Sequence, residues 1–464
     1  MQVLKFTADG VGDRSYMVVD TVRKCAAVID AQRDVWTYLD EADRLGVTIT
    51  HAFDTHVHND FVSGSNALRA IAGATVVQAA GPDFGYPVRA VSDGERVDVG
   101  GAFVMRALHT PGHTFDHLSY VVEERDEPVA LFTGGSLLVE TIGRTDLVSP
   151  GAAEELARAQ RASLLKLLDF PDATDVFPTH GAGSFCSAGD APDRDTTSIG
   201  REKRDNAAAR IAMGQDEDAF VRFALHGLTE YPAYYAHMGP INLIGALPLL
   251  RLPELEGLDP LRAYELQRAG AAIVDSRPSD EFVRAFPRGA RAIPLGDSFS
   301  GYIGITLPFN DELVLVLSRD DQWRRAQAQL IRIGYDRARG YVLGGFSSWQ
   351  RADLPIDRLT AITIDQLHKR HHDDDVAILD VRYDPEWKSG HIPGATHVSI
   401  GRLPSRLGDV PGDGERQLVT MCGSGARATL AGSILRRAGY DPLVVTAGGF
   451  SEWSDKQWPT VTGS

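Results

Sequence analysis

Short runs of apolar, β-branched residues recur along the chain and predict strands. In the first half they include YMVVD, AAVID, ATVVQA, FVMRAL, LSYVVE and VALFTGG. Longer stretches with helical periodicity lie between them, such as DVWTYLDEADRLG and AAEELARAQRASLLKLLDF. Mixed strands and helices of this kind predict a layered α/β domain, which we place at residues 1–245.

Two segments in the second half repeat one pattern. The first runs from AAIVDSRPSDEF to VLGGFSSW, and the second runs from VAILDVRYDPEW to TAGGFSEW. Ser318 and Cys422 occupy the same position, each 31 residues before a tryptophan. Such similarity indicates two copies of one domain, which we place at 258–352 and 360–464. Within each copy, strand runs alternate with helical patterns, which is typical of a parallel α/β sheet.

Composition narrows the range of functions. The 464 residues carry a formal net charge of −16, which disfavours binding to a polyanion such as nucleic acid. No apolar run is long enough to span a membrane, and the N-terminus lacks the pattern of a secretory signal. The three cysteines are far apart and odd in number, so they do not form a disulfide framework. We expect a cytoplasmic protein that binds neither nucleic acid nor membrane.

Cys422 is a candidate nucleophile. It follows the apolar run LVTM and precedes a helical pattern, so it lies where unpaired helix N–H groups favour a thiolate and an anion. Arg427 is the second candidate catalytic residue, because it adds a positive charge at the end of the loop, where an anion would approach. The residues between them, which can turn their amides inward, are Gly423, Ser424, Gly425 and Ala426. The alternative is a buried structural cysteine that ends a core strand.

Three segments of the second copy, DVRYDPEWKSGHIPGATHV, CGSGAR and AGGFSEW, resemble the rhodanese family. The resemblance implies that Cys422 accepts a sulfane sulfur as a persulfide and passes it to a thiophilic acceptor. Its expected small-molecule partners are a thiol persulfide, thiosulfate or sulfite. In the first copy, Ser318 cannot form a persulfide, and Asp320 and Asp321 repel an anion. We therefore expect the first copy to be catalytically silent, with a scaffold or docking role.

Histidines collect at the predicted strand ends of the first domain. FDTHVHNDF carries His56, His58 and Asp60, while HTPGHT carries His113 and PTHG carries His180. Neutral imidazole is a common ligand of zinc and iron. We expect one iron or zinc ion on His56, His58 and His113, with Asp60 and His180 close by.

This series resembles the metallo-β-lactamase superfamily, which implies an αββα fold. With IGRTDL and the rhodanese copies, the whole chain resembles persulfide dioxygenase–rhodanese fusions. In such enzymes two histidines and one aspartate hold one iron(II), and a thiol persulfide and oxygen give sulfite. Here Gly135 stands where the aspartate is expected and Phe61 stands where a histidine is expected. The ligand set is therefore altered, and the missing side chain at Gly135 predicts a cavity that a carboxylate could fill.

Further residues are expected near this site. Cys186 is either a persulfide relay or a packing residue, and Tyr231 and His237 lie in an aromatic run that either closes a substrate pocket or packs in the core. Arg144, in IGRTDL, belongs to the same expected pocket. One alternative for the first domain is a glyoxalase II-like thioester hydrolase, and another is a metal-free scaffold for sulfur carriage. A homo-oligomer is also an open expectation.

Overall fold

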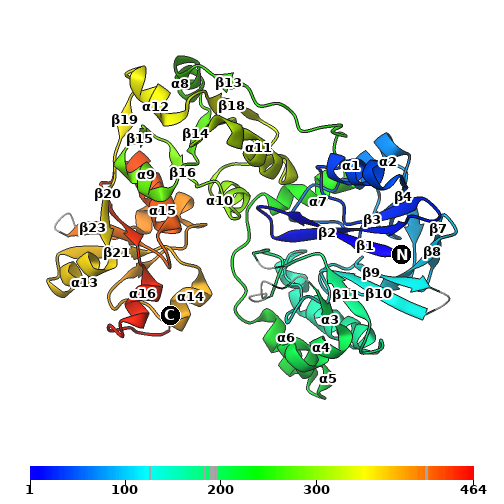
Figure 1. The fold of residues 1–464 in the computed structure, drawn as a ribbon. Coiled ribbons are helices and arrows are strands. Elements are labelled where there is room, and N and C mark those ends of the chain that lie inside the picture. Colours follow the sequence, from blue (N-terminus) through cyan, green and yellow to red (C-terminus); the bar gives the residue numbers. More distant parts are fainter. Residues whose placement is uncertain (125–126, 182, 189–193, 195, 413–415, 464) are drawn as a thin grey trace. The chain divides into compact units, whose positions relative to one another are not determined.

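The computed structural model describes residues 1–124, 127–181, 183–188, 194, 196–412 and 416–463 (Figure 1). Its internal contacts divide the chain into two units. The first comprises Met1–Pro253 and Ile331–Gly334, and the second comprises Glu254–Leu330 and Tyr335–Ser464. Among the described helices, none is both long enough and apolar enough to cross a membrane.

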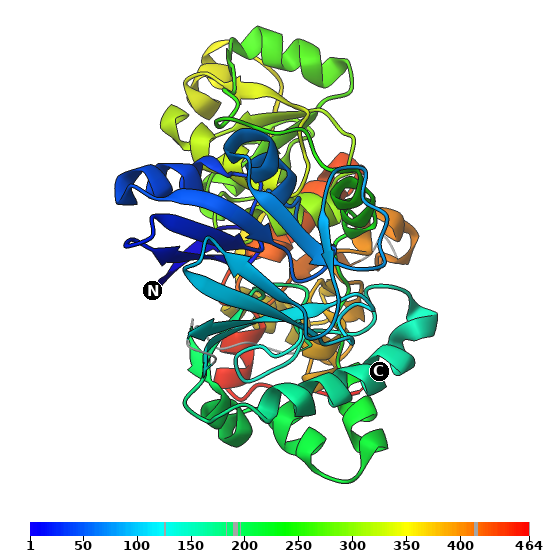
Figure 2. The same cartoon turned by 90° about the vertical axis from the view of Figure 1, so that its right-hand side faces the viewer.

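The first unit contains two six-stranded sheets that lie face to face (Figure 2). One sheet has the order β1-β2-β3-β4-β5-β6, with bounds Gln2–Ala8, Asp13–Asp20, Cys25–Ile29, Thr48–Phe53, Thr75–Ala79 and Arg89–Val91. The other has the order β12-β11-β10-β9-β8-β7, with bounds Thr197–Ser198, Asp175–Pro178, Glu127–Gly134, Leu118–Glu124, Phe103–His109 and Arg96–Val99. Side chains from both sheets, such as Phe53 and Phe132, fill the buried layer between them.

Helices cover the outer face of each sheet. On the first sheet, Tyr38 of α1 and Leu68 of α2 are buried against strand residues. On the second sheet, Leu164 of α3 and Phe220 of α6 are likewise buried against strand residues. The helices of this unit are α1 Trp36–Leu45, α2 Ser65–Ala72, α3 Ala153–Leu168, α4 Ile199–Asp205, α5 Ala207–Met213, α6 Glu217–Leu225 and α7 Tyr235–Ile244. The layers confirm the expected αββα fold.

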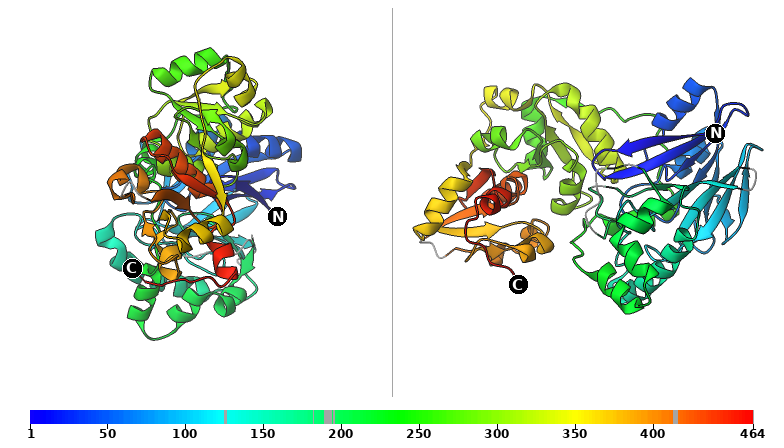
Figure 3. Two further views of the ribbon diagram at one scale, coloured as in Figure 1. Left: turned by 90° about the vertical axis from the view of Figure 1, so that its left-hand side faces the viewer. Right: turned by 60° about the horizontal axis from the view of Figure 1, so that its bottom comes forward.

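The second unit contains two five-stranded parallel sheets with matching strand orders (Figure 3). The first has the order β13-β18-β17-β14-β16, with bounds Gly257–Leu258, Ala338–Val342, Leu313–Val316, Ala272–Asp275 and Arg291–Ala292. The second has the order β20-β24-β23-β21-β22, with bounds Thr360–Thr363, Leu443–Ala447, Gln417–Met421, Val376–Asp380 and Thr396–His397. Two copies of one parallel α/β domain are therefore confirmed.

The copies also share a buried ion pair, at the end of β14 in the first copy and at the end of β21 in the second. In the first copy the Arg277 guanidinium binds the Asp275 carboxylate at 2.5 Å, and in the second Arg382 binds Asp380 at 2.7 Å. All four side chains are buried. The pair fixes the loop after the strand in both copies, so its presence alone does not distinguish the serine copy from the cysteine copy.

Helix α15 (Ala426–Arg437), which follows the cysteine loop, is buried over the eight consecutive residues Ala428–Leu435. It packs on β23 and β24 of its own sheet, and also on β16 and α9 (Ser279–Arg284) of the first copy. The Ser433 hydroxyl oxygen accepts a hydrogen bond from the Ala292 N–H at 3.2 Å. A helix that is buried all round has no solvent-facing stripe. The first copy thus completes the burial of the helix that supports Cys422.

Candidate metal centre and cysteine loop

The segment after β4, which carries His56 and His58, is organised by the buried carboxylate of Asp30. This carboxylate accepts hydrogen bonds from the Thr55 N–H at 2.7 Å and the Thr55 hydroxyl at 2.9 Å. It also contacts His58 Nε2 at 3.1 Å and the Thr179 hydroxyl. Burial alone would raise the pKa of Asp30, but His58 and these donors lower it. An ionised carboxylate therefore links the loops that follow β4 and β11.

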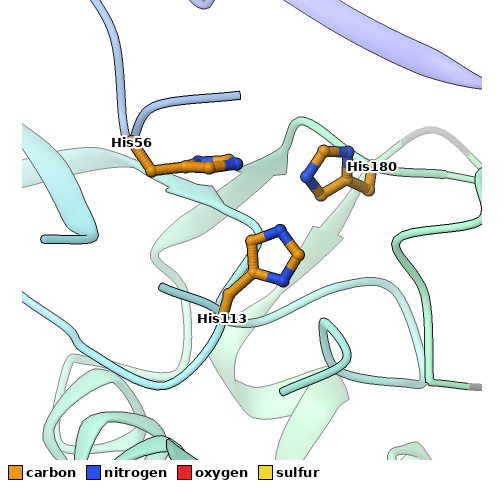
Figure 4. Close-up of side chains that lie close together, drawn as sticks. All are labelled: His56, His113 and His180. Atoms are coloured by element: carbon orange, nitrogen blue, oxygen red, sulfur yellow. The ribbon is translucent and has the colours of Figure 1, made fainter. Parts of the chain in front are cut away.

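Three histidines from separate strand ends point toward one another (Figure 4). His56 follows β4, His113 follows β8, and His180 follows β11. Each offers one ring nitrogen, and these three atoms lie within 4.8 Å of one another. All three side chains are buried. The arrangement brings together two predicted ligands, His56 and His113, with His180, which was expected only close to the site.

The hydrogen bonds of these histidines leave a set of Nε2 atoms for a ligand. In each ring, Nδ1 makes a hydrogen-bond contact. His56 Nδ1 contacts the Thr55 hydroxyl at 2.9 Å, and His113 Nδ1 contacts the Arg144 carbonyl at 2.8 Å. His180 Nδ1 contacts the Asp13 carboxylate at 2.8 Å. The Nε2 atoms of His56 and His180 are buried without a hydrogen-bond partner. A metal ligand commonly donates its other ring N–H to a carbonyl or carboxylate, as seen here. These orphaned nitrogens fit a transition-metal ion.

The electrostatic surroundings differ among the three rings. Burial and the neighbouring histidines lower the pKa of His56, and burial first and then His180 lower the pKa of His113 to about 3. Burial also opposes the charge on His180, but the carboxylates of Asp60 and Asp13 raise its pKa to about 10. Two rings are thus neutral near pH 7, and a metal would have to displace a proton from the third.

His58 lies in different surroundings. Its Nε2 contacts Asp30, its Nδ1 lies 3.9 Å from Asp60, and its ring stacks on Phe61 at 4.2 Å between centroids. His58, Asp60 and His180 form a second group that could hold an ion. The ligand role of His58 stays a prediction. Its bond to Asp30 favours His180 as the third imidazole beside His56 and His113.

The expectation that Gly135 leaves a usable cavity is wrong. A Cβ atom added there would lie 2.7 Å from His113 Cγ and 2.8 Å from His113 Nε2. The backbone is not the obstacle, because the positive φ of 53° belongs to Gly134. The Gly135 N–H donates to His117 Nε2 at 2.9 Å. The His113 imidazole therefore occupies the space that a side chain would need.

The other residues of the expected pocket are placed by packing. Cys186 is fully buried with its Sγ 3.6 Å from the Tyr235 hydroxyl, and burial raises the pKa of its thiol well above the usual value. This favours the packing interpretation over the relay. The guanidinium of Arg144 is buried against Asp146 and lies 5.1 Å from the ring centroid of Tyr231. His237 is exposed on α7. Their roles toward a substrate stay predictions.

Cys422 directly follows β23, which ends at Met421, and its loop leads into α15. The Gly425 N–H donates to Cys422 Sγ at 3.1 Å, and the backbone of Gly425 is left-handed, with φ 106°. A Cβ atom on Gly425 would lie 2.6 Å from the Thr446 carbonyl oxygen, so only glycine fits there. An amide aimed at sulfur stabilises a thiolate or a persulfide anion. The loop thus has the polarity that the sequence suggested.

Arg427 lies at the end of the loop, but its charge is paired. Its guanidinium binds both oxygens of Glu386 on α14 (Asp384–Ser389), at 2.5 and 2.7 Å. Glu386 also accepts a hydrogen bond from the Tyr383 N–H at 2.9 Å. Glu386 was not predictable as a site residue, because nothing in the sequence pattern pairs it with a residue 41 positions away.

Comparisons with known proteins agree with this architecture. The family model described as "Rhodanese-like domain" matches residues 259–352 and 363–456. The crystal structure of a metallo-beta-lactamase from Staphylococcus aureus subsp. aureus COL is 26% identical, with a TM-score of 0.64, and the match covers 74% of this chain and 98% of that one. The chain is a metallo-β-lactamase-fold–rhodanese fusion.

Other relatives match the first part of the fusion. A hydroxyacylglutathione hydrolase of Rhodospirillum rubrum is 35% identical over 167 residues, which are 36% of this chain and 60% of that protein. The structure of ETHE1 from Myxococcus xanthus is 32% identical with a TM-score of 0.45, over 52% of this chain and 98% of that one. The fusion thus spans somewhat more than half the length of the hydrolase.

The fusion also has a site residue, Asp13, that was not predictable from the sequence pattern. Asp13, the first residue of β2, is 167 positions from His180 and binds its Nδ1. Burial first and then Asp60 raise the pKa of Asp13 to about 7. An aspartate at the start of an edge hairpin looks like a surface residue in the sequence. Only the fold shows that it is fully buried.

In the first rhodanese copy of the fusion, the loop after β17 has another conformation. Ser318 is exposed, whereas Cys422 is buried. Asp321 takes the position of Gly425 and is held by Arg319 at 3.0 Å. A short helix over Asp320–Gln322 replaces the inward-turned loop. These features support the expectation that the first copy is silent.

Proposed function

We propose that the fusion is a sulfur-metabolism enzyme in which Cys422 transfers sulfane sulfur. The observation that carries this proposal is the Gly425 N–H aimed at Cys422 Sγ from 3.1 Å. The Cys422 thiolate attacks the outer sulfur of a persulfide, R–S–S⁻. A new S–S bond forms to Cys422 as the old one breaks, and R–S⁻ leaves with its electron pair. The enzyme persulfide then passes the same sulfur to a second thiophile.

Cys422→Ser tests this proposal directly. We expect loss of sulfur transfer by at least about a thousandfold, because a serine hydroxyl does not ionise near neutral pH and cannot carry the sulfur. The measurement is the rate of sulfur transfer from a persulfide or thiosulfate to cyanide. Ser318→Ala, at the matching position of the first copy, is the control and should keep the full rate. Transfer by Cys422→Ser at the unaltered rate would overturn the proposal.

We further propose that His56, His113 and His180 hold one iron or zinc ion. A bound ion would supply an open coordination position for a small sulfur compound. The protein's contribution is to hold three Nε2 lone pairs toward one point through the Nδ1 hydrogen bonds, with Asp13 bound to His180. The buried surroundings exclude bulk water from these rings.

For this domain we favour oxidation of a thiol persulfide, in which R–SSH, O2 and H2O give R–SH, sulfite and two protons. The motifs of the chain and its two rhodanese-like domains support that reaction. A metal-dependent thioester hydrolase is the second candidate, because relatives at 35% identity are hydroxyacylglutathione hydrolases. Three measurements separate oxidation from hydrolysis: the metal content per chain, oxygen uptake with a thiol persulfide, and thioester cleavage. Thioester cleavage without oxygen uptake would overturn the oxidation.

A further inference from the structure

The two arginines near Cys422 are each paired with a carboxylate, and this pairing bears on which sulfur donor can bind. Two arginines lie close to the loop, and a carboxylate binds each of them with two contacts. Arg382 donates to Asp380 Oδ2 at 2.7 Å and to Oδ1 at 3.0 Å, and Arg427 donates to Glu386 Oε2 at 2.5 Å and to Oε1 at 2.7 Å. Bidentate arginine–carboxylate pairs of this kind are strong and hold a fixed geometry. Neither guanidinium therefore presents an uncompensated charge to an approaching anion.

The Arg427–Glu386 pair lies directly against the loop. A Cβ atom added to Gly423, the residue after Cys422, would lie 3.6 Å from Arg427 Nη2 and 3.9 Å from Glu386 Oε1. Glu386 is the more exposed partner, with 36% of its side chain accessible against 13% for Arg427. Burial alone would raise the pKa of Glu386, but the bonds from Arg427 lower it. A carboxylate that is ionised near pH 7 thus faces solvent beside the loop.

We propose that Glu386 determines donor specificity by disfavouring a dianion, such as thiosulfate, relative to an organic persulfide with one negative charge. This inference rests on the proposed sulfur transfer by Cys422. With thiosulfate, the Cys422 thiolate would take the outer sulfur and sulfite would leave as a dianion with the electron pair. The Glu386 carboxylate repels two charges in that donor and one in R–S–S⁻. Arg427 then serves chiefly to hold the carboxylate and the loop.

The first copy supplies a matched control. Glu281 stands at the position of Glu386, in SDEF against DPEW, and Trp323 stands at the position of Arg427. Glu281 is exposed on α9. Glu281→Gln therefore removes the same charge from the same place in a copy without the cysteine, and it should leave transfer from every donor unchanged.

The test compares kcat/KM for thiosulfate and for 2-hydroxyethyl persulfide, whose organic part is uncharged, with cyanide as acceptor in the full-length protein. For Glu386→Gln we expect a rise of about tenfold with thiosulfate and a change below about threefold with the persulfide. Glu386→Asp keeps the charge and should keep the preference of the unaltered protein. An equal change for both donors in Glu386→Gln would mean that Glu386 only supports the loop, and it would overturn the inference.

A second measurement does not depend on sulfur transfer. Alkylation of Cys422 by iodoacetate, an anion, and by neutral iodoacetamide is followed by mass spectrometry of its peptide. Glu386→Gln should raise the iodoacetate rate relative to the iodoacetamide rate, and an unchanged ratio contradicts the inference. If Cys422→Ser still transfers sulfur, the proposed function is wrong. The ratio of the iodoacetate rate to the iodoacetamide rate would still decide whether Glu386 repels an anion near Cys422.

Discussion

Adding one methyl group at Gly135 is a sharp perturbation of the candidate metal centre. In Gly135→Ala the new Cβ would lie 2.7 Å from His113 Cγ, whereas carbon atoms normally approach to ~3.5–4.0 Å. The ring cannot retreat freely, because its Nδ1 is hydrogen-bonded to the Arg144 carbonyl at 2.8 Å. The imidazole must therefore move by roughly 1 Å. Such a shift breaks its bond to the Arg144 carbonyl or misdirects Nε2.

The expected cost follows from overpacking. Extra methyl groups in a packed core destabilise by about 1–3 kcal/mol, and for a unit of this size about 2 kcal/mol lowers Tm by about 4–8 °C. Metal content should fall by more than about half, because a site of three imidazoles has no spare ligand. Gly135→Asp should behave the same way, since its carboxylate reaches the site only through the same Cβ.

The assay measures iron or zinc per chain after reconstitution, together with the metal-free Tm. Gly151→Ala is the matched control, because an added Cβ at Gly151 has no heavy atom within 4 Å. It should bind metal and melt like the unaltered protein. A Gly135→Ala protein with full metal content and an unchanged Tm would refute the packing argument, and so would a gain of metal in Gly135→Asp.

Three further predictions concern the two sites. His180→Ala should lower metal content as far as His56→Ala, whereas His58→Ala should retain most of it; equal losses in all three, measured as metal per chain, would restore His58 as a ligand. Gly425→Ala should lower kcat/KM for sulfur transfer by at least about tenfold and Tm by several degrees, because φ at 106° is strained for alanine; an active variant would contradict this. Asp30→Asn should cost about 2–3 kcal/mol at pH 7, since four donors face its carboxylate. Because the folded pKa of Asp30 is lowered, that loss, measured by denaturant unfolding, should disappear as pH falls from about 4 through the folded value.

Much of the architecture was predictable because it depends on local patterns. The matching positions of Ser318 and Cys422 in a repeat identified two copies of one domain, and the structure shows two sheets with matching strand orders. His56 and His113 follow strands of the two facing sheets, β4 and β8, and their motifs made the cluster predictable as well. The glycine-rich cysteine loop follows from the turn that glycine permits.

The choice among neighbouring histidines was not predictable, because it depends on partners that are distant in sequence. Asp30 lies 28 residues before His58 and engages its Nε2, and Asp13 reaches His180 across 167 residues. The space at Gly135 was unpredictable for the same reason, since a pattern shows a missing side chain but not the ring that fills its place. The pairing of Arg427 by Glu386 likewise depends on the fold.

Helix α15 shows a use for a domain copy that has serine at the position of the cysteine. The residue at position 318 does not change the surface of β16 and α9, and α15 is buried against that surface. A gene shortened to the last domain would expose an apolar helix face next to Cys422, which favours aggregation. The first copy therefore has a structural role as half of a shared core, whether or not it is a catalyst. The two copies should accordingly unfold as one cooperative body.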